Sequence, residues 1–192
     1  MNELLKIFLT SLLVDNVVYS QYLAICPFIG MSGDVHKATG MGIATSFVIL
    51  LATAVTWPLY TYIMVPNHVE FLQTLIFILV IASLVQLVEF YLKKSSPGLY
   101  SSMGIYLSLI TTNCAVLGVT INCIAKDYNY VQSLVYALGS AMGFLMSLVV
   151  MSGIRKRVDV APVPKAFKGN AILFIAAGLM SLAFSGFKGL IR

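Results

Sequence analysis

The sequence predicts an all-α integral membrane protein. Of its 192 residues, 59% are hydrophobic and 10% are charged, whereas soluble globular domains carry about 25% charged residues. The charged residues separate apolar stretches of the length that a helix needs to cross a bilayer, about 20 residues. The six predicted spans are 7–30, 39–65, 71–92, 99–125, 129–154 and 169–190. The short loops leave room for a single membrane domain, 1–192, and for no separate soluble domain.

The first span, 7–30, is expected to remain in the mature protein. Its apolar region is longer than that of a cleavable signal peptide, Asp15 and Asn16 interrupt it, and no small-residue cleavage pattern follows. Pro27 favours an end or an interruption of this helix close to that residue. A broken helix inside a membrane is tolerated only where protein or a cofactor covers the freed backbone groups.

The second and fifth spans, 39–65 and 129–154, carry small residues at helical spacing. Gly40 and Gly42 lie in the second span, and Gly139 and Gly143 lie in the fifth. Small residues let two helices approach closely in lipid. We therefore interpret these glycines as helix-packing positions.

A polar break at 93–98 divides the chain into two halves of three spans, about 1–94 and 97–192. Because three is an odd number, halves that share a fold must be inserted in opposite orientations, as two inverted three-helix repeats. Each half carries a Cys-x-x-x-Gly element in or at the end of its first span, starting at Cys26 and Cys114. We expect the first helix of each half to be interrupted there.

The positive residues fall in loops and predict the topology. One predicted side holds Lys37, Lys93, Lys94, Arg155, Lys156, Arg157, Lys165 and Lys168, and the other holds Lys6, Lys126, Lys188 and Arg192. The excess of positive charge in cytoplasmic loops places both termini on the non-cytoplasmic side. The net charge of +5 does not indicate nucleic-acid binding, because no polar domain gathers it.

Cys26 and Cys114 are candidate metal ligands. Thiolates are soft ligands that favour iron–sulfur clusters, zinc or cuprous copper. Zinc is less favoured, because His36 and His68 fall in loops on opposite predicted sides. Two thiolates are half of the usual four-thiolate iron–sulfur set, so a partner chain would have to supply the rest. Spacing alone favours the alternative that both cysteines are small buried apolar residues.

Cys123 follows Cys114 by nine residues and therefore lies on the opposite face of a helix. We interpret it as a packing residue.

Asp15 is an intramembrane carboxylate, which usually faces a cavity, a partner or an ion path. On a continuous helix Asp15 and Cys26 would point in nearly the same direction, three turns apart. Two interpretations remain open, an ion path that includes Asp15 and Asn16 or a hydrogen-bonded polar pair.

The chain resembles the Rnf–Nqr family of membrane subunits over essentially its whole length, and within it the A-type subunits of Rnf electron transport complexes. The strings Cys26–Gly30, Leu109–Gly118, Phe167–Ile172 and Ala177–Phe184 carry the resemblance. The second string is highly specific. Pro27 favours the Rnf branch over its Nqr relatives.

The resemblance implies a non-autonomous subunit of an ion-translocating ferredoxin:NAD oxidoreductase in the prokaryotic cytoplasmic (inner) membrane. It implies that Cys26 and Cys114, together with two cysteines of the homologous E-type Rnf subunit, hold an intramembrane [2Fe–2S] cluster that relays electrons. Electron flow would be coupled to Na⁺ or H⁺ movement. The B-, C-, D- and G-type Rnf subunits would be further partners, with NAD, FMN and the other clusters on other chains, and no catalytic residue is assigned to this chain.

The chain departs from the family pattern at one place. Family members often have two asparagines where Asp15 and Asn16 stand here, which argues against a general ion-binding role for Asp15. Three other functions are kept as alternatives: an inverted-repeat transporter or channel with structural cysteines, the E-type subunit of the Na⁺-translocating NADH:quinone reductase, and a purely structural assembly subunit.

Overall fold

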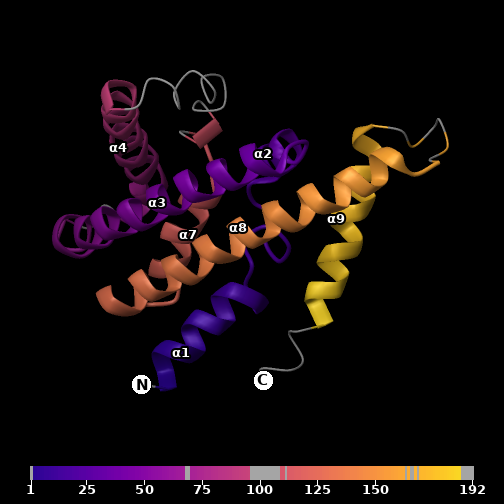
Figure 1. Cartoon of the computed structure of the whole chain (residues 1–192). Coiled ribbons are helices and arrows are strands. Elements are labelled where there is room, and N and C mark those ends of the chain that lie inside the picture. The colour runs from indigo at the N-terminus through magenta and orange to yellow at the C-terminus, as the bar shows by residue number, and fades with distance from the viewer. Residues whose placement is uncertain are drawn as a thin grey trace.

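The computed structural model describes residues 2–67, 70–95, 109–110, 112–162, 164, 167 and 169–186. These residues form helices and no strand, which confirms the all-α prediction. The long helices α3 and α8 lie side by side through the middle of the molecule, with α1 against α8 and with α4 and α9 at opposite ends (Figure 1).

The first predicted span is not one helix. Helix α1 (Asn2–Leu9) continues into the π-helical turn η1 (Thr10–Val14), and the chain then leaves helical structure until α2 (Ile25–Met31). We call residues 15–24 the interruption. It ends three residues before Pro27, so the break expected close to that proline is present but precedes it. Pro27 is the third residue of α2, where its missing N–H removes no intrahelical hydrogen bond.

Two residues explain where the interruption begins and ends. The side-chain oxygen of Asn16 accepts a hydrogen bond from the Val18 N–H at 3.0 Å, which gives the backbone an alternative to a helical bond. Ala24, the residue before α2, has a left-handed backbone with φ of 60°, a conformation that a helix cannot continue through. It is fully buried.

The rest of the first half is regular. Helix α3 (Val35–Leu59) begins after Asp34, whose carboxylate accepts a hydrogen bond from the His36 N–H at 3.2 Å. A proline inside its last turn, Pro58, precedes the π-helical turn η2 (Tyr60–Met64). The short 3₁₀ turn η3 (Glu70–Leu72) then leads into α4 (Gln73–Ser95).

Among the described residues, helices α7, α8 and α9 belong to the second half. Helix α7 (Cys114–Ala125) is capped by Asn113, whose side-chain oxygen accepts a hydrogen bond from the Ala115 N–H at 3.0 Å. Helix α8 (Tyr130–Val160) begins with a capping box, a start signal that satisfies two backbone donors. Helix α9 (Asn170–Ser185) begins after Gly169, whose φ of 102° favours glycine.

Small residues set the packing on α8, as the sequence predicted. Helix α3 runs antiparallel to α8, and a side chain at Gly42 would press on Leu145. The Ser46 hydroxyl donates to the Ala141 carbonyl at 3.2 Å. On another face of α8, a side chain at Gly139 would collide with Ser11 of η1. These contacts confirm the packing interpretation for Gly42, where α3 meets α8, and for Gly139, where η1 meets α8.

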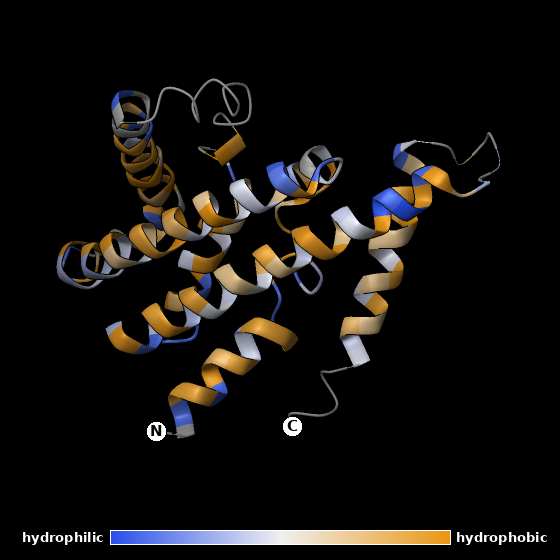
Figure 2. Ribbon diagram, viewed as in Figure 1, coloured by the Kyte–Doolittle hydropathy of each residue, from blue (hydrophilic) through white to orange (hydrophobic). Residues whose placement is uncertain are grey.

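Among the residues that the structure describes, three helices are long and apolar enough to cross a membrane: Val35–Met64, Gln73–Phe90 and Tyr130–Val160. They agree with the second, third and fifth predicted spans. The apolar helices α7 and α9 are shorter, at Cys114–Ala125 and Asn170–Ser185. Apolar residues cover α4 and α9 nearly all round (Figure 2). Their large exposed side chains include Leu79, Leu87, Phe90, Leu179 and Leu182, as expected for a multi-pass membrane protein whose outer faces meet lipid or other subunits.

Several predictions fall outside the described residues. They are the start of the fourth span at 99–108, the end of the sixth span at 187–190, the repeat boundary at 96–98, His68, and the topology charges Lys165, Lys168, Lys188 and Arg192.

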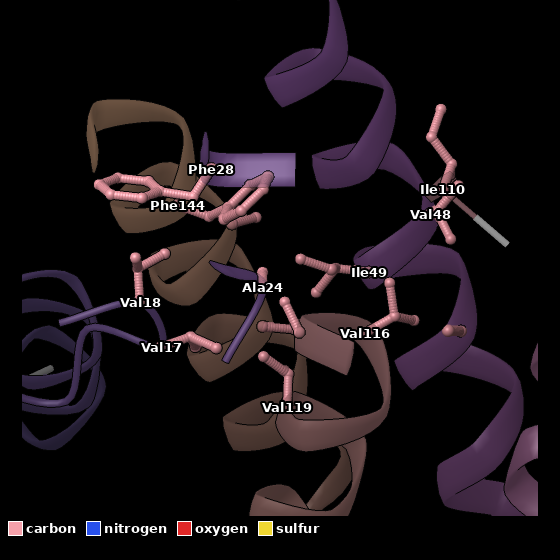
Figure 3. Packing of buried hydrophobic residues seen from close by; sticks show 14 of the residues in the cluster. Val17, Val18, Ala24, Phe28, Val48, Ile49, Ile110, Val116, Val119 and Phe144 are labelled. Carbon is pink, nitrogen blue, oxygen red and sulfur yellow. The ribbon is translucent and has the colours of Figure 1, made fainter. Parts of the chain in front are cut away.

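The core is centred on the interruption. Ala24 lies near Val17 of the interruption and Val116 and Val119 of α7, while Phe28 of α2 and Phe144 of α8 lie above it (Figure 3). All six are at most 1% exposed. Residues 16–19 and Ala24 of the interruption are therefore buried by protein, the condition under which a broken helix is tolerated inside a membrane.

Candidate metal centre and polar interruption

The two predicted ligand cysteines each lie at the start of a helix. Cys26 is the second residue of α2 and is exposed, whereas Cys114 is the first residue of α7 and is half-buried. Both are free thiols. The two Cys-x-x-x-Gly elements therefore have the same local structure: in each, the cysteine lies in the first turn of a helix.

A hydrogen bond joins these two helix starts. The backbone N–H of Ala24, two residues before Cys26, donates to the sulfur of Cys114 at 2.8 Å. Leu23 packs against Gly118 one turn further along α7, so closely that a side chain at Gly118 would have to displace the end of the Leu23 side chain. The structure thus brings together segments that lie 90 residues apart in the sequence. The N–H donor also shows that the Cys114 sulfur accepts hydrogen bonds, as a metal-bound thiolate does.

Asn113 contributes a second polar feature beside Cys114. Its side-chain oxygen caps α7, but its side-chain nitrogen, Nδ2, is buried and has no hydrogen-bond partner among the residues that the structure describes. Buried amide donors nearly always find an acceptor. A bound group with sulfur atoms at this position would accept a hydrogen bond from this free donor next to the thiol.

The donor set fits half of a four-thiolate iron–sulfur site. Two soft ligands come from helix starts that touch, a backbone N–H already points at one sulfur, and the exposed Cys26 faces outward, where another chain can approach. Among the described residues, no three His, Cys, Asp or Glu side chains gather into a group that could bind a metal. The two thiols are two of the four ligands of the usual site.

Asp15 and Cys26 do not share a helix face. The interruption separates them, so the direction that a continuous helix would give does not apply. The carboxylate of Asp15 instead forms an ion pair with Lys126 at the C-terminal end of α7, and the two side chains are 26% and 33% exposed. The Lys126 ammonium lies 4.8 Å from the ring centre of Tyr136, within range for a cation–π interaction.

The ion pair governs the protonation of Lys126. Burial by itself lowers the pKa of this amine, but the hydrogen bond to Asp15 and nearby negative charge outweigh it and raise the pKa above its ordinary value. Lys126 therefore stays protonated at neutral pH. In the sequence, Lys126 looks like an ordinary charged loop residue, and nothing indicates that it lies close to Asp15 in space.

Asn16 is a buried structural link. Its side-chain nitrogen donates to the Gly143 carbonyl of α8 at 3.1 Å. Its oxygen accepts hydrogen bonds from Val18 N–H at 3.0 Å and from the Ser147 hydroxyl at 3.2 Å. Asp15 and Asn16 therefore do not form the polar pair that the sequence suggested. Asp15 contacts the end of α7, and Asn16 contacts α8.

Cys123 lies in the core, 1% exposed. Its sulfur contacts the Ser133 carbonyl at 3.8 Å, which agrees with the packing role expected from its helix face.

Sequence reasoning missed two further residues near the cysteines. Ala24 carries no chemical signal in its side chain, since its contribution is a backbone N–H. Arg155, which contacts the end of α2, was interpreted only as a topology charge.

Comparison with known proteins identifies the family. Residues 4–191 match the Rnf-Nqr family, described as "Rnf-Nqr subunit, membrane protein". The chain is 51% identical over 191 residues to the A-type subunit of the ion-translocating oxidoreductase complex of Syntrophotalea carbinolica, covering 100% of this chain and 99% of that protein. It is 47% identical over 192 residues to the A-type subunit of the same kind of complex in Aeromonas salmonicida, with 100% of both chains covered.

A third relative has a more specific name. The A-type subunit of the Na⁺-translocating ferredoxin:NAD⁺ oxidoreductase complex of Acetobacterium woodii is 48% identical over 187 residues, 97% of each chain. The match to the family model, which is described as a membrane protein, agrees with the apolar helices. The chain belongs to the Rnf-Nqr family of membrane subunits.

Proposed function

We propose that this chain is an electron-relay subunit of an ion-translocating ferredoxin:NAD⁺ oxidoreductase and that it holds half of an intramembrane [2Fe–2S] site. The names of its relatives support the complex. The observation that carries the relay is the hydrogen bond from Ala24 N–H to the Cys114 sulfur, which joins the two cysteine-bearing helix starts. When bound, the cluster would accept and release one electron at a time.

The chain's own residues would prepare this site. Cys26 and Cys114 supply two thiolates, and Ala24 N–H stabilises the negative charge on one of them. Nδ2 of Asn113, the residue before Cys114, is a second donor that has no partner among the described residues. The homologous E-type subunit would supply the other two thiolates across an interface at the exposed Cys26.

The proposed architecture has six spans in two inverted three-helix repeats, about 1–94 and 97–192. Its support is the antiparallel pairing of α3 with α8, the second spans of the two halves. Opposite insertion of the halves requires those two helices to run in opposite directions. Both termini would then lie outside the cytoplasm, in a cytoplasmic (inner) membrane. The B-, C-, D- and G-type subunits would complete the complex and carry NAD, FMN and the remaining clusters.

The path of the translocated Na⁺ or H⁺ is a separate part of the proposal. Asp15 is a carboxylate within the broken first span, and Asn16 lines a cavity of about 270 Å³ between the interruption and α9. Tyr19 and Ser181 also line this cavity. Polar groups around a non-helical segment are the usual surroundings of ion sites in membrane transporters.

Iron analysis of the intact complex tests the relay. We expect the wild-type complex to contain iron that is lost, together with [2Fe–2S] absorption, from the Cys26→Ser/Cys114→Ser double variant. The Cys123→Ser complex is the matched control and should keep both. A transporter with structural cysteines predicts equal iron in all three complexes, and a purely structural role predicts normal turnover of the double variant. Either result would overturn the relay.

A further inference from the structure

Helix α2 carries Cys26, and its short length means that outside contacts must hold it. It has seven residues, whereas isolated helices shorter than about 12 residues are marginal. Its first turn is anchored by Ala24, through the hydrogen bond to Cys114. Its middle is anchored by Phe28, which is 1% exposed and meets the Tyr19 ring edge-on, with 5.8 Å between ring centres.

The end of α2 is anchored by Arg155 of α8. One guanidinium nitrogen of Arg155, Nη1, donates to the Ile29 carbonyl at 2.9 Å and to the Ser32 hydroxyl oxygen at 2.9 Å. The Ser32 hydroxyl in turn donates to the same Ile29 carbonyl at 3.1 Å. Ser32 is fully buried. The three groups form a closed triangle at the C-terminal end of the helix.

The chemistry of Arg155 suits this position. The last carbonyls of a helix have no intrahelical partner and carry partial negative charge, so a cation at this end binds them favourably. A guanidinium is always charged and donates in a fixed plane. Its neighbours Lys156 and Arg157 are exposed, whereas Arg155 is half-buried. Arg155 is therefore the member of the basic run that turns inward.

We propose that Arg155 is a positioning residue for Cys26: by fastening the end of α2 to α8, it fixes where that thiolate stands relative to Cys114. This inference rests on the proposed cluster. Without Arg155, α2 keeps its anchors at Ala24 and Phe28 but loses the one at its end. The seven-residue helix can then unwind from its end and rotate about its own axis, which spreads the positions of the Cys26 sulfur.

The experiment uses the purified complete complex with Arg155→Gln, Arg155→Lys and Ser32→Ala, and with Arg157→Gln as the matched control from the same helix. Two properties are measured: the rate at which an iron chelator removes the Cys26-dependent cluster, and the width of its EPR signal after reduction. Changes near metal ligands typically lower metal affinity about 10–100-fold. We expect Arg155→Gln to lose the cluster about tenfold faster, with a broader signal.

The other variants separate geometry from charge. Arg155→Lys keeps the charge but not the planar fork, so it should fall between wild type and Arg155→Gln. Ser32→Ala should accelerate loss less than Arg155→Gln does. Combined with Arg155→Gln it should add little, because both act on one hydrogen-bonded group. Arg157→Gln should behave as wild type.

The outcomes distinguish this inference from the proposed function. Loss rates and signal widths in Arg155→Gln equal to those of Arg157→Gln would overturn the positioning role while leaving the cluster in place. Absence of a Cys26-dependent cluster from the wild-type complex would overturn the proposed function and the inference with it. Should Arg155→Gln fail to assemble, Ser32→Ala and Arg155→Lys decide: faster loss in both supports the role, and wild-type behaviour in both overturns it.

Discussion

Asn16 holds the interruption to the middle of α8. All the polar atoms of its side chain bond within the protein, to Gly143, Val18 and Ser147, and the residue is 1% exposed. A sequence reveals a polar residue in an apolar span but not the partner that satisfies it. That is why Asn16 could be singled out and its structural contacts could not.

Asn16→Ala should therefore destabilise the complex. The change leaves the Val18 N–H without its side-chain acceptor in a buried place, and an unsatisfied buried group costs about 1–3 kcal/mol in the free energy of unfolding. Thermal unfolding of the purified complex measures the effect. Asn67→Ala is the control, because Asn67 is exposed and its side chain donates to the Ile63 carbonyl within its own segment. Equal unfolding temperatures for both variants would show that the Asn16 contacts contribute nothing.

A substitution of Asp15 tests the proposed ion path. Asp15→Asn removes the charge partner of Lys126 but not the cysteines, so electron flow should persist while fewer ions move per electron. The direct stability cost should be small, about 1 kcal/mol or less, because both side chains are partly exposed. Ion transport and NAD⁺ reduction are measured together in proteoliposomes. An unchanged ion-to-electron ratio would remove Asp15 from the path.

At the scale of elements, the long regular helices were predictable and the broken one was not. The second, third and fifth spans have uninterrupted apolar runs, and helices α3, α4 and α8 cover them. The first span was expected to break near Pro27, because proline is the strongest helix breaker in that stretch. The break instead follows from the side chain of Asn16 and the left-handed backbone of Ala24, which depend on tertiary packing.

The contact of η1 with α8 gives an element-scale prediction. An added methyl group in Gly139→Ala would collide with Ser11 and approach the Phe8 carbonyl. Overpacking of this kind costs about 1–3 kcal/mol, which exceeds the gain of about 1 kcal/mol in helix propensity from Gly to Ala. Gly153→Ala on the same helix gains the same propensity and meets nothing within 4 Å. We expect Gly139→Ala to lower the unfolding temperature and Gly153→Ala to leave it equal or higher.

The reverse order of the two unfolding temperatures would contradict close packing of η1 on α8. The same pair of variants also separates this contact from general effects of alanine in α8. Both positions are glycines of one helix, and they differ in whether another segment lies against them.

At the scale of the whole molecule, the proposed topology makes a labelling prediction. Glu3, in α1, and Lys156, near the C-terminal end of α8, are both exposed. A membrane-impermeant thiol reagent applied to intact cells should label Glu3→Cys and not Lys156→Cys, whereas inverted membrane vesicles should give the opposite pattern. Wild type serves as the control for the native cysteines. Labelling of both positions from one side would contradict the charge-based orientation.

The site as a whole could be predicted only in part. The paired Cys-x-x-x-Gly elements and the family resemblance pointed to Cys26 and Cys114, and the structure brings their helix starts into contact. The backbone donor at Ala24 and the contact of Arg155 with Ile29 could not be predicted. Both depend on segments that are about 90 or more residues apart in the sequence.

EPR spectroscopy of the reduced complex with single cysteine substitutions tests the central claim most directly. Cys26→Ser and Cys114→Ser should each abolish the signal of one [2Fe–2S] cluster, while Cys123→Ser, a change in the core and away from the joined helix starts, should leave it intact. Retention of that signal in both Cys26→Ser and Cys114→Ser, with the complex fully assembled, would contradict the account.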